Sequence, residues 1–319
     1  MSKNVIDAVI NYSNKYDTEL GLIASRRQVD HLTGYTGFTT AKLATYVRSK
    51  SQKVLLQRDH GGPFQGSYID NGMDSAKVDA KYLHIVHVDP FKAPEVTFNR
   101  AISKTVQLIE HCLDVSPYTL FEVGTEQAIF PYEPSDLDKL LNILEKVFGP
   151  DFARIKYAVV QSGTGLDLGK SLNTGTFNSD KLSEFVKVCN AYGVQSKEHN
   201  GDFLSADQIK SRFDLGLSGL NVAPELGQVE TSVYLSNANE IAKVRLFKLA
   251  LDSAYWKKWV KEGFDPHEHR EELIMIAGHY LFNTMPFREI VSRHIGDLTS
   301  EIQTALEERI HFLVTSANG

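Results

Sequence analysis

Side chains suited to acid–base or metal chemistry recur where apolar stretches of this 319-residue sequence end. The clearest case is residues 54–63, VLLQRDHGGP, in which four residues suited to a buried strand lead into Asp59 and His60. Neighbouring side chains of a regular strand point to opposite faces, so these two can share one site only if the strand ends here. The two glycines and the proline that follow favour such an end. The alternative is a capped turn with a surface histidine.

The same pattern follows the other predicted strands. Polar residues lie at or near the ends of the stretches 81–90, 119–126, 157–163 and 193–202, and the candidates are Asp89, Glu126, Gln161, Glu198 and His199. His84 and His87 lie in the middle of a predicted strand, and we interpret them as packing residues.

Imidazole and carboxylate groups at these ends give His60, Glu126 and His199 as a candidate set for a divalent metal, with Gln161 in reach. Two nitrogens and one oxygen with an open position suit catalytic zinc. Asp59 would then be the base that removes a proton from a carbon next to a carbonyl that the metal coordinates. The alternative is that these histidines only form structural hydrogen bonds.

Basic residues also lie close to the predicted strand ends and favour an anionic substrate. They are Arg26, Arg27, Arg58, Lys170 and Lys197. Each of them can equally be a solvated surface charge. The glycine-rich segment 163–175 resembles the late loops of barrels, which bind phosphate through backbone N–H groups.

Predicted strands alternate with amphipathic helices up to about residue 227, which is typical of a parallel α/β sheet. Because candidate residues follow strand after strand, a barrel mouth explains them better than the single switch point of an open sheet. We therefore predict a TIM-type (β/α)8-like barrel over residues 1–227. A helical C-terminal extension over 228–319 is expected to pack on it as part of a single structural unit.

Composition narrows the class of protein. Apolar residues make up 42% of the chain and charged residues 23%, with a net charge of −6, which is typical of a soluble globular protein and argues against nucleic-acid binding. Cys112 and Cys189 are the only cysteines and indicate neither a disulfide framework nor a thiolate zinc site; Cys189 is expected in the core. No apolar run of about 18 residues suggests a membrane span. We expect a cytoplasmic protein with no membrane or nucleic-acid partner.

Eight short motifs in series resemble the non-catalytic subunit family of D-tagatose-1,6-bisphosphate aldolase, which is related to class II aldolases. They are QVDHLTGYTGFT (28–39), DHGGP (59–63), HVD (87–89), VGTE (123–126), VVQSG (159–163), EHNGD (198–202), NVAPEL (221–226) and YWKKWVKEGF (255–264). The resemblance implies a zinc-dependent barrel. It also implies that the predicted first strand of the family, ahead of the helix at 3–14, has no evident counterpart here.

By motif, the resemblance places Asp59, Glu126 and Asp202 in catalytic roles and His60, Glu126 and His199 at a divalent metal, with zinc expected. Substrate contact is assigned to the residues Arg26, Arg27, Asp89, Gln161 and Lys197. Class II aldolases have a histidine where Gln161 falls, which makes this zinc site weaker.

Two functions remain open from the sequence. The first is a metal-dependent aldolase or epimerase acting on a ketose, uronate or sugar phosphate. The second is a non-catalytic subunit that stabilises a partner tagatose-bisphosphate aldolase or associates with itself, with an apolar docking surface near Trp256 and Trp259. A sugar-phosphate kinase is disfavoured because the chain has no G-x-x-x-x-G-K-S/T loop.

Overall fold

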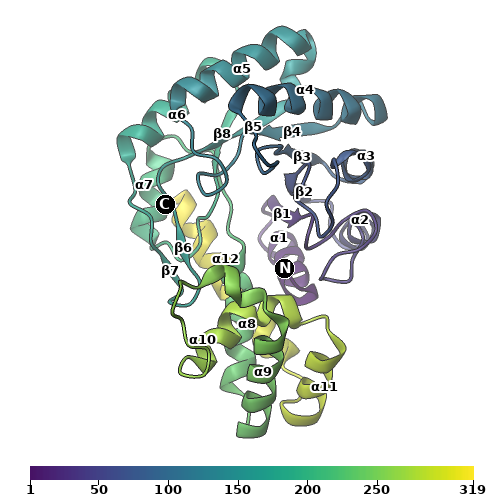
Figure 1. Ribbon diagram of the computed structural model, residues 1–319, viewed down its shortest axis with the longest axis vertical. Coiled ribbons are helices and arrows are strands. Elements are labelled where there is room, and N and C mark those ends of the chain that lie inside the picture. The colour runs from purple at the N-terminus through teal and green to yellow at the C-terminus, as the bar shows by residue number, and fades with distance from the viewer.

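Seven parallel strands form a strongly curled sheet in the order β1-β2-β3-β4-β5-β8-β9, seen in a computed structural model that describes all 319 residues (Figure 1). The strands are β1 (Leu20–Ser25), β2 (Val54–Gly61), β3 (Ile85–Val88), β4 (Leu120–Val123), β5 (Ile155–Val160), β8 (Gln195–Glu198) and β9 (Gly219–Leu220). The predicted barrel-type α/β fold is confirmed, as a curled sheet in which the edge strands β1 and β9 do not pair.

One helix, α1, precedes the first strand, and the others connect successive strands and cover the outside of the sheet (Figure 1). They are α1 (Lys3–Lys15), α2 (Thr40–Arg48), α3 (Met73–Tyr82), α4 (Phe98–Val115), α5 (Pro134–Phe148), α6 (Ser179–Ala191) and α7 (Ala206–Asp214). Hydrophilic caps set their starts: Ser2, Thr39 and Ser205 each accept a hydrogen bond from a first-turn N–H. In α5 the cap residue is Glu133 and the first helical residue is Pro134, so Ser135 lies inside the helix.

The C-terminal part is helical, as expected. It comprises α8 (Pro224–Ser236), α9 (Glu240–Ser253), the 3₁₀ helix η2 (Tyr255–Trp259), α10 (Arg270–Leu281), α11 (Met285–His294) and α12 (Thr299–Asn318). The last strand, β9, is followed closely by α8, which already begins at Pro224. The predicted boundary at residue 227 thus falls inside α8, and the division into two parts stays a prediction.

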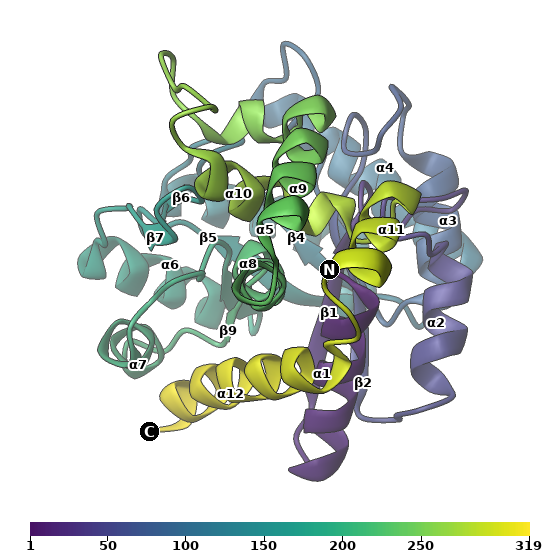
Figure 2. The same cartoon turned by 90° about the horizontal axis from the view of Figure 1, so that it is seen from below.

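The gap between β1 and β9 is covered by the last helix. A cavity of about 360 Å³ lies there, lined by Leu20 of β1, Leu220 of β9, and Val314 and Ala317 of α12. Figure 2 shows α12 lying across α1. Leu306 and Ile310 of α12 are buried in the same apolar cluster as α1. The terminal helix therefore occupies the outside of the sheet where its two edges fail to meet.

Short, loop-built elements complete the molecule. A two-stranded hairpin of β6 (Leu166–Asp167) and β7 (Leu172–Asn173) lies in the glycine-rich segment, and the 3₁₀ helix η1 (Gly149–Arg154) precedes β5. Cys112 and Cys189 are both buried, and Cys189 packs in the core as expected. No helix is long and apolar enough to cross a membrane.

Candidate metal centre

The site is built on a distortion of β2. The pairing of β2 with β3 shifts register between Arg58 and Gly61, and His60 takes a left-handed backbone conformation with φ of +47°. This bulge re-aims side chains that a regular strand would point to opposite faces. Asp59 and His60 therefore converge, as predicted. The predicted cause is wrong, because the strand continues to Gly61 and bulges instead of ending.

Three imidazoles form a nearly equilateral triangle at the mouth of the curled sheet. The ring centroids of His60, His87 and His199 are each 5.1 Å from the other two. The carboxylate of Asp59 completes the group: its Oδ1 lies 3.8 Å from His60 Nε2 and 3.8 Å from His199 Nδ1. Ligand atoms of the four residues all lie within 4.8 Å of one another.

Buried carboxylates orient two of the three rings. Asp89 Oδ2 accepts a hydrogen bond from His60 Nδ1 at 2.6 Å, and Glu122 Oε1 accepts one from His199 Nε2 at 2.6 Å. Both contacts leave the other ring nitrogen, His60 Nε2 or His199 Nδ1, without a hydrogen bond. Carboxylates behind histidine ligands fix the ring and make the free nitrogen more basic.

The ring of His87 makes different contacts from those of His60 and His199. Its Nδ1 accepts a hydrogen bond from the His60 backbone N–H at 3.1 Å, and its Nε2 donates to the carbonyl oxygen of Gly124 at 3.0 Å. Both ring nitrogens are thus engaged. His87 holds the bulge of β2 in place at the edge of the group, which is more than the packing role expected for it.

The group fits a divalent cation. Asp59 Oδ1 is buried and has no hydrogen-bond partner, although burying an acceptor without a partner is costly. Ligand atoms bound at about 2.1 Å in a tetrahedral zinc site lie about 3.4 Å from one another, so only a small inward movement is needed. The expected composition of two imidazole nitrogens and one carboxylate oxygen is present, with Asp59 in the place predicted for Glu126.

The charges of the group are strongly coupled. Burial disfavours the imidazolium of His60, but the carboxylates of Asp59 and Asp89 outweigh it and raise the pKa of His60 to about 10. Burial raises the pKa of Asp59, but the surrounding histidines lower it by more, so the pKa lies below its ordinary value. The pKa of Glu122 is held well below its ordinary value, against its burial, by Lys197, His87 and His199. A cation is therefore favoured between these carboxylates.

Glu126 and Asp202 lie outside the group of four. Glu126 is half-buried after β4, and its Oε2 accepts a hydrogen bond from Asn200 Nδ2 at 2.5 Å. Its charge still acts on His60. Asp202 Oδ1 accepts the backbone N–H groups of Ala223 and Glu225 at the start of α8, both at 2.9 Å. Their catalytic roles stay predictions.

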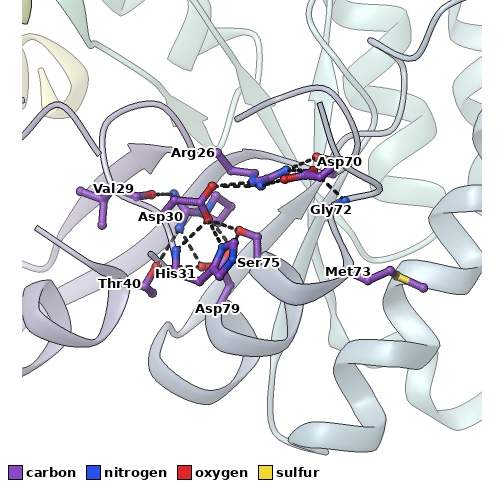
Figure 3. A network of polar contacts seen from close by, with 12 residues as sticks. Arg26, Val29, Asp30, His31, Thr40, Asp70, Gly72, Met73, Ser75 and Asp79 are labelled. Atoms are coloured by element: carbon purple, nitrogen blue, oxygen red, sulfur yellow. Dashed lines mark hydrogen bonds and ion pairs between the residues drawn. The ribbon is translucent and has the colours of Figure 1, made fainter. Parts of the chain in front are cut away.

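Arg26 is buried in a structural network (Figure 3). Its guanidinium pairs with Asp70 through two hydrogen bonds of 2.7 and 2.6 Å, with Asp30 at 3.0 Å, and with the carbonyl of Gly62 at 2.8 Å. These contacts tie the loop after β2 to the loop after β1. Arg27, in contrast, is exposed.

Three other predicted substrate contacts are buried and engaged with the protein. Gln161 bonds only backbone groups of the segment 125–132, and Asp89 holds His60 as described. Lys197 Nζ donates to Glu122 Oε2 and to Gln57 Oε1, each at 2.8 Å, inside the barrel. Substrate contact stays a prediction for these residues, and the contacts observed for each are structural.

His87 and Glu122 are the site residues that the sequence analysis missed. They are partners in the β3–β4 register and each lies in an otherwise apolar strand. An ionisable residue inside a short apolar strand is the signal that could have found them, because it must find a buried partner.

The curled α/β fold is similar to that of several solved barrel-type proteins. It superposes on a probable tagatose 6 phosphate kinase from Sinorhizobium meliloti with a TM-score of 0.79 and 15% identity, over 98% of this chain and 97% of that one. It also superposes on the fructuronate-tagaturonate epimerase UxaE of Cohnella laeviribosi with a TM-score of 0.61 and 9% identity, over 94% and 81%. At these identities the likeness shows a shared fold.

The curated proteins point to one family. The D-tagatose-1,6-bisphosphate aldolase subunit GatZ of Escherichia coli is 21% identical over 314 aligned positions, covering 82% of this chain and 74% of the relative. The chain is thus similar to this subunit, and the resemblance expected from its motifs is confirmed. No family model matches the chain.

Proposed function

We propose that this chain is an enzyme of carbohydrate metabolism that transfers a proton next to the carbonyl of a ketose, uronate or sugar phosphate, in an aldolase or epimerase reaction. One observation carries the proposal. Asp59 Oδ1 lies 3.8 Å from His60 Nε2 and 3.8 Å from His199 Nδ1, and none of these three atoms has a hydrogen bond. The names of the relatives, an aldolase subunit and a sugar-acid epimerase, support the substrate class.

In this proposal His60, His199 and Asp59 hold a divalent metal, with zinc the expected ion. A divalent metal supplies a Lewis acid that polarises a carbonyl and so acidifies the neighbouring C–H. Asp89 and Glu122 keep the two imidazoles oriented. Because Asp59 faces both rings, we assign it to the metal and assign the proton transfer to Glu126. The sequence analysis expected the opposite, with Asp59 as the base and Glu126 as a metal ligand.

The surroundings of Glu126 support this assignment. It is half-buried, whereas Glu122, four residues earlier in β4, is fully buried and bonded to Lys197 and His199. The hydrogen bond from Asn200 orients one oxygen of Glu126 and leaves the other free of side-chain contacts. A base must be within reach of the substrate, and Glu126 is the more accessible of the two carboxylates.

The test is exchange of substrate C–H for deuterium in heavy water, followed by NMR with ketose phosphates and uronates. We expect Glu126→Gln to keep its metal and lose exchange by at least about a hundredfold, the scale of a lost general base. Asp59→Asn should lose metal and exchange together. Glu184→Gln, an exposed carboxylate on α6, is the control. If Asp59→Asn keeps its metal but loses exchange, the assignments of Asp59 as metal ligand and Glu126 as base are reversed. If the zinc-loaded native protein shows no exchange, the proposed enzymatic activity is rejected.

A second candidate function is a subunit that stabilises a partner aldolase, and the description of the curated relatives as subunits is compatible with it. The prediction of an apolar docking surface near Trp256 is wrong at that residue, because Trp256 is buried against Phe264 and the apolar core between α9 and α10. Co-expression with a class II aldolase tests this function. A partner subunit would co-purify and raise the melting temperature of the aldolase, and a chain that does neither does not serve as its stabilising subunit.

A further inference from the structure

The two edge strands of the curled sheet line the same cavity without pairing. β1 pairs only with β2, and β9 pairs only with β8, so each strand has one edge without a partner. Both strands line the cavity of about 360 Å³ in the gap, and none of the four residues of the metal-binding group lines it. An unpaired edge presents backbone N–H and C=O groups that can bond to another extended chain.

Free space lies on both sides of this gap. On the inner side the cavity reaches the interior of the curled sheet, where Tyr157 and Lys197 line it. On the helix side lies a second cavity of about 230 Å³, which is almost entirely apolar and is lined by Phe213 and by other residues of α1, α7, α8 and α12. Leu20 of β1 and Leu220 of β9 line both cavities. The gap therefore opens to both faces of the sheet.

The two cavities suit the alternating side chains of a strand. Successive side chains of an extended segment point to opposite faces. A segment lying between β1 and β9 would therefore place every second side chain among the apolar helix residues. The others would enter the interior beside Lys197 and Gln57, which are already bonded to each other. Apolar residues suit the first set and small polar residues the second, whereas a compact ligand in one cavity would leave both edges unpaired.

A glycine on each edge keeps the interior cavity open. A Cβ added to Gly21 of β1 would have no atom within 4 Å, and one added to Gly219 of β9 would lie 3.3 Å from Lys197 Cγ. Neither glycine has a positive φ, so the backbone conformation does not require glycine at either position. The space at Gly21 is thus free for a side chain of another strand.

Two polar residues next to the edges have no side-chain partner in the chain. Asn221, directly after β9, is buried and lines the interior cavity, and its Nδ2 has no hydrogen-bond partner. Its backbone groups already bond to Glu198 and Gly201. A buried donor without an acceptor is costly, and a carbonyl of an inserted peptide would supply one. Glu19, directly before β1, lines the same cavity, is exposed and forms no ion pair.

We propose that the gap between β1 and β9 binds an extended segment of a partner protein, which adds an eighth strand parallel to both edges. Because such a strand begins near Glu19, a basic residue at its amino end complements that carboxylate. Small polar and apolar residues then alternate along it. In this mode of recognition main-chain hydrogen bonds supply affinity and alternate side chains supply specificity. The inference goes beyond the proposed function, since it requires neither the metal nor turnover.

The experiment is fluorescence anisotropy of a labelled, end-capped peptide, one lysine followed by three serine-valine repeats, titrated with the full chain. We expect this peptide to bind. The same peptide with N-methylated valines should bind at least about tenfold more weakly, because it cannot donate those hydrogen bonds to an edge. Glu19→Gln should weaken binding of the unmethylated peptide by about twofold to fivefold at low salt, the scale of an exposed ion pair.

Gly21→Ile tests the place of binding. The added side chain enters the free space of the interior cavity, and isoleucine favours strands, so the variant should fold, which circular dichroism checks. We expect it to bind the peptide at least about tenfold more weakly than the native chain, because the strand and the new side chain need the same space. Val244→Ser, which changes an exposed apolar residue of α9, is the control and should bind like the native chain.

The proposal is overturned if the native chain does not bind the peptide, if it binds the N-methylated peptide equally well, or if folded Gly21→Ile binds like the native chain. Decanoate and size-exclusion chromatography test two other occupants. Decanoate that binds the native chain and not Gly21→Ile, without peptide binding, would assign the gap to an acyl chain. A native dimer that Gly21→Ile dissociates would assign it to a second copy of the chain. Either result would also overturn the proposal.

Discussion

At the scale of single residues, the mouth of the sheet is dominated by charges buried next to their partners. Asp89 and Glu122 each pair with a histidine, and Lys197 pairs with Glu122. Such pairs do little for net stability compared with apolar packing, but losing one partner is costly because the other is left buried and charged. The residue-scale predictions use this asymmetry.

Arg58 and Asp79 form the most completely buried ion pair outside the metal-binding group. Two hydrogen bonds of 2.7 Å join them, and Arg58 also donates to the carbonyls of Ala24 and Val29. We expect Asp79→Asn to lower the free energy of unfolding by about 3–5 kcal/mol, the cost of leaving a buried charge without its partner. Urea denaturation measures it. Asp74→Asn, exposed on the same helix, is the control, and a loss below about 1 kcal/mol for Asp79→Asn would contradict the expected cost.

Asp202 predicts a pH dependence of stability. Burial raises its pKa to about 7, the charge of Glu225 adds to this, and the N–H groups of residues 223 and 225 oppose it. Because the folded-state pKa lies above the unfolded one, this group contributes stability at low pH that is lost as pH rises towards 7. Asp202→Asn should therefore gain on the order of 3 kcal/mol relative to the native chain between pH 4 and pH 8.

Urea titrations at several pH values across this range measure the difference, with Asp214→Asn, an exposed carboxylate on α7, as the control. The asparagine oxygen can still accept both backbone N–H groups, so the cap of α8 should survive. A difference between variant and native chain that does not change with pH would show that Asp202 titrates normally.

At the scale of elements, loops after the strands carry the chemistry and interior side chains hold those loops. Gln161 at the end of β5 bonds the carbonyls of Thr125 and Phe130 and the N–H of Tyr132. The segment 125–132, which contains Glu126, is thus fastened to the neighbouring strand by Gln161, and the hydroxyl of Tyr132 also donates to the carbonyl of Val159 in β5.

We expect Gln161→Leu to loosen that segment, because three backbone groups lose their partner at once. Hydrogen–deuterium exchange of peptides covering 125–132 should become faster, with little change in α4 and α5. Gln107→Leu, an exposed glutamine of α4, is the control. Unchanged exchange in the segment would mean that other contacts are enough to hold it.

The sequence predicts much of this arrangement and misses the rest for a definite reason. Alternating strands and helices predict the fold, and positions at strand ends predict His60 and His199. The sequence could not predict that Asp59 takes the place expected for Glu126 in the metal-binding group. This placement depends on the left-handed conformation of His60, which contacts with His87 maintain. Glu122 was missed because only the curl of the sheet shows that its side chain meets His199.

At the scale of the whole molecule, the sheet curls like a barrel but its edges do not pair. The sequence predicts a barrel without an evident first strand, and the gap between β1 and β9 agrees with that expectation. Apolar side chains of α12 cover the gap from outside. The terminal helix therefore contributes to stability, although it is far along the chain from the strands it protects.

Leu306 of α12 is fully buried in this contact. We expect Leu306→Ala to lower the free energy of unfolding by about 2–5 kcal/mol, through lost burial and a new cavity. Chemical denaturation measures this, with Glu308→Ala on the exposed face of the same helix as the control. If both variants unfold alike, α12 does not support the sheet.

The measurement that tests the account most directly is the metal content of the untagged protein by mass spectrometry, beside a His60→Ala/His199→Ala double variant and Glu126→Gln. The account predicts about one divalent ion per chain in the native protein and in Glu126→Gln, and none in the double variant. A native protein that binds no metal after dialysis against zinc, or a double variant that binds as much as the native protein, would contradict it.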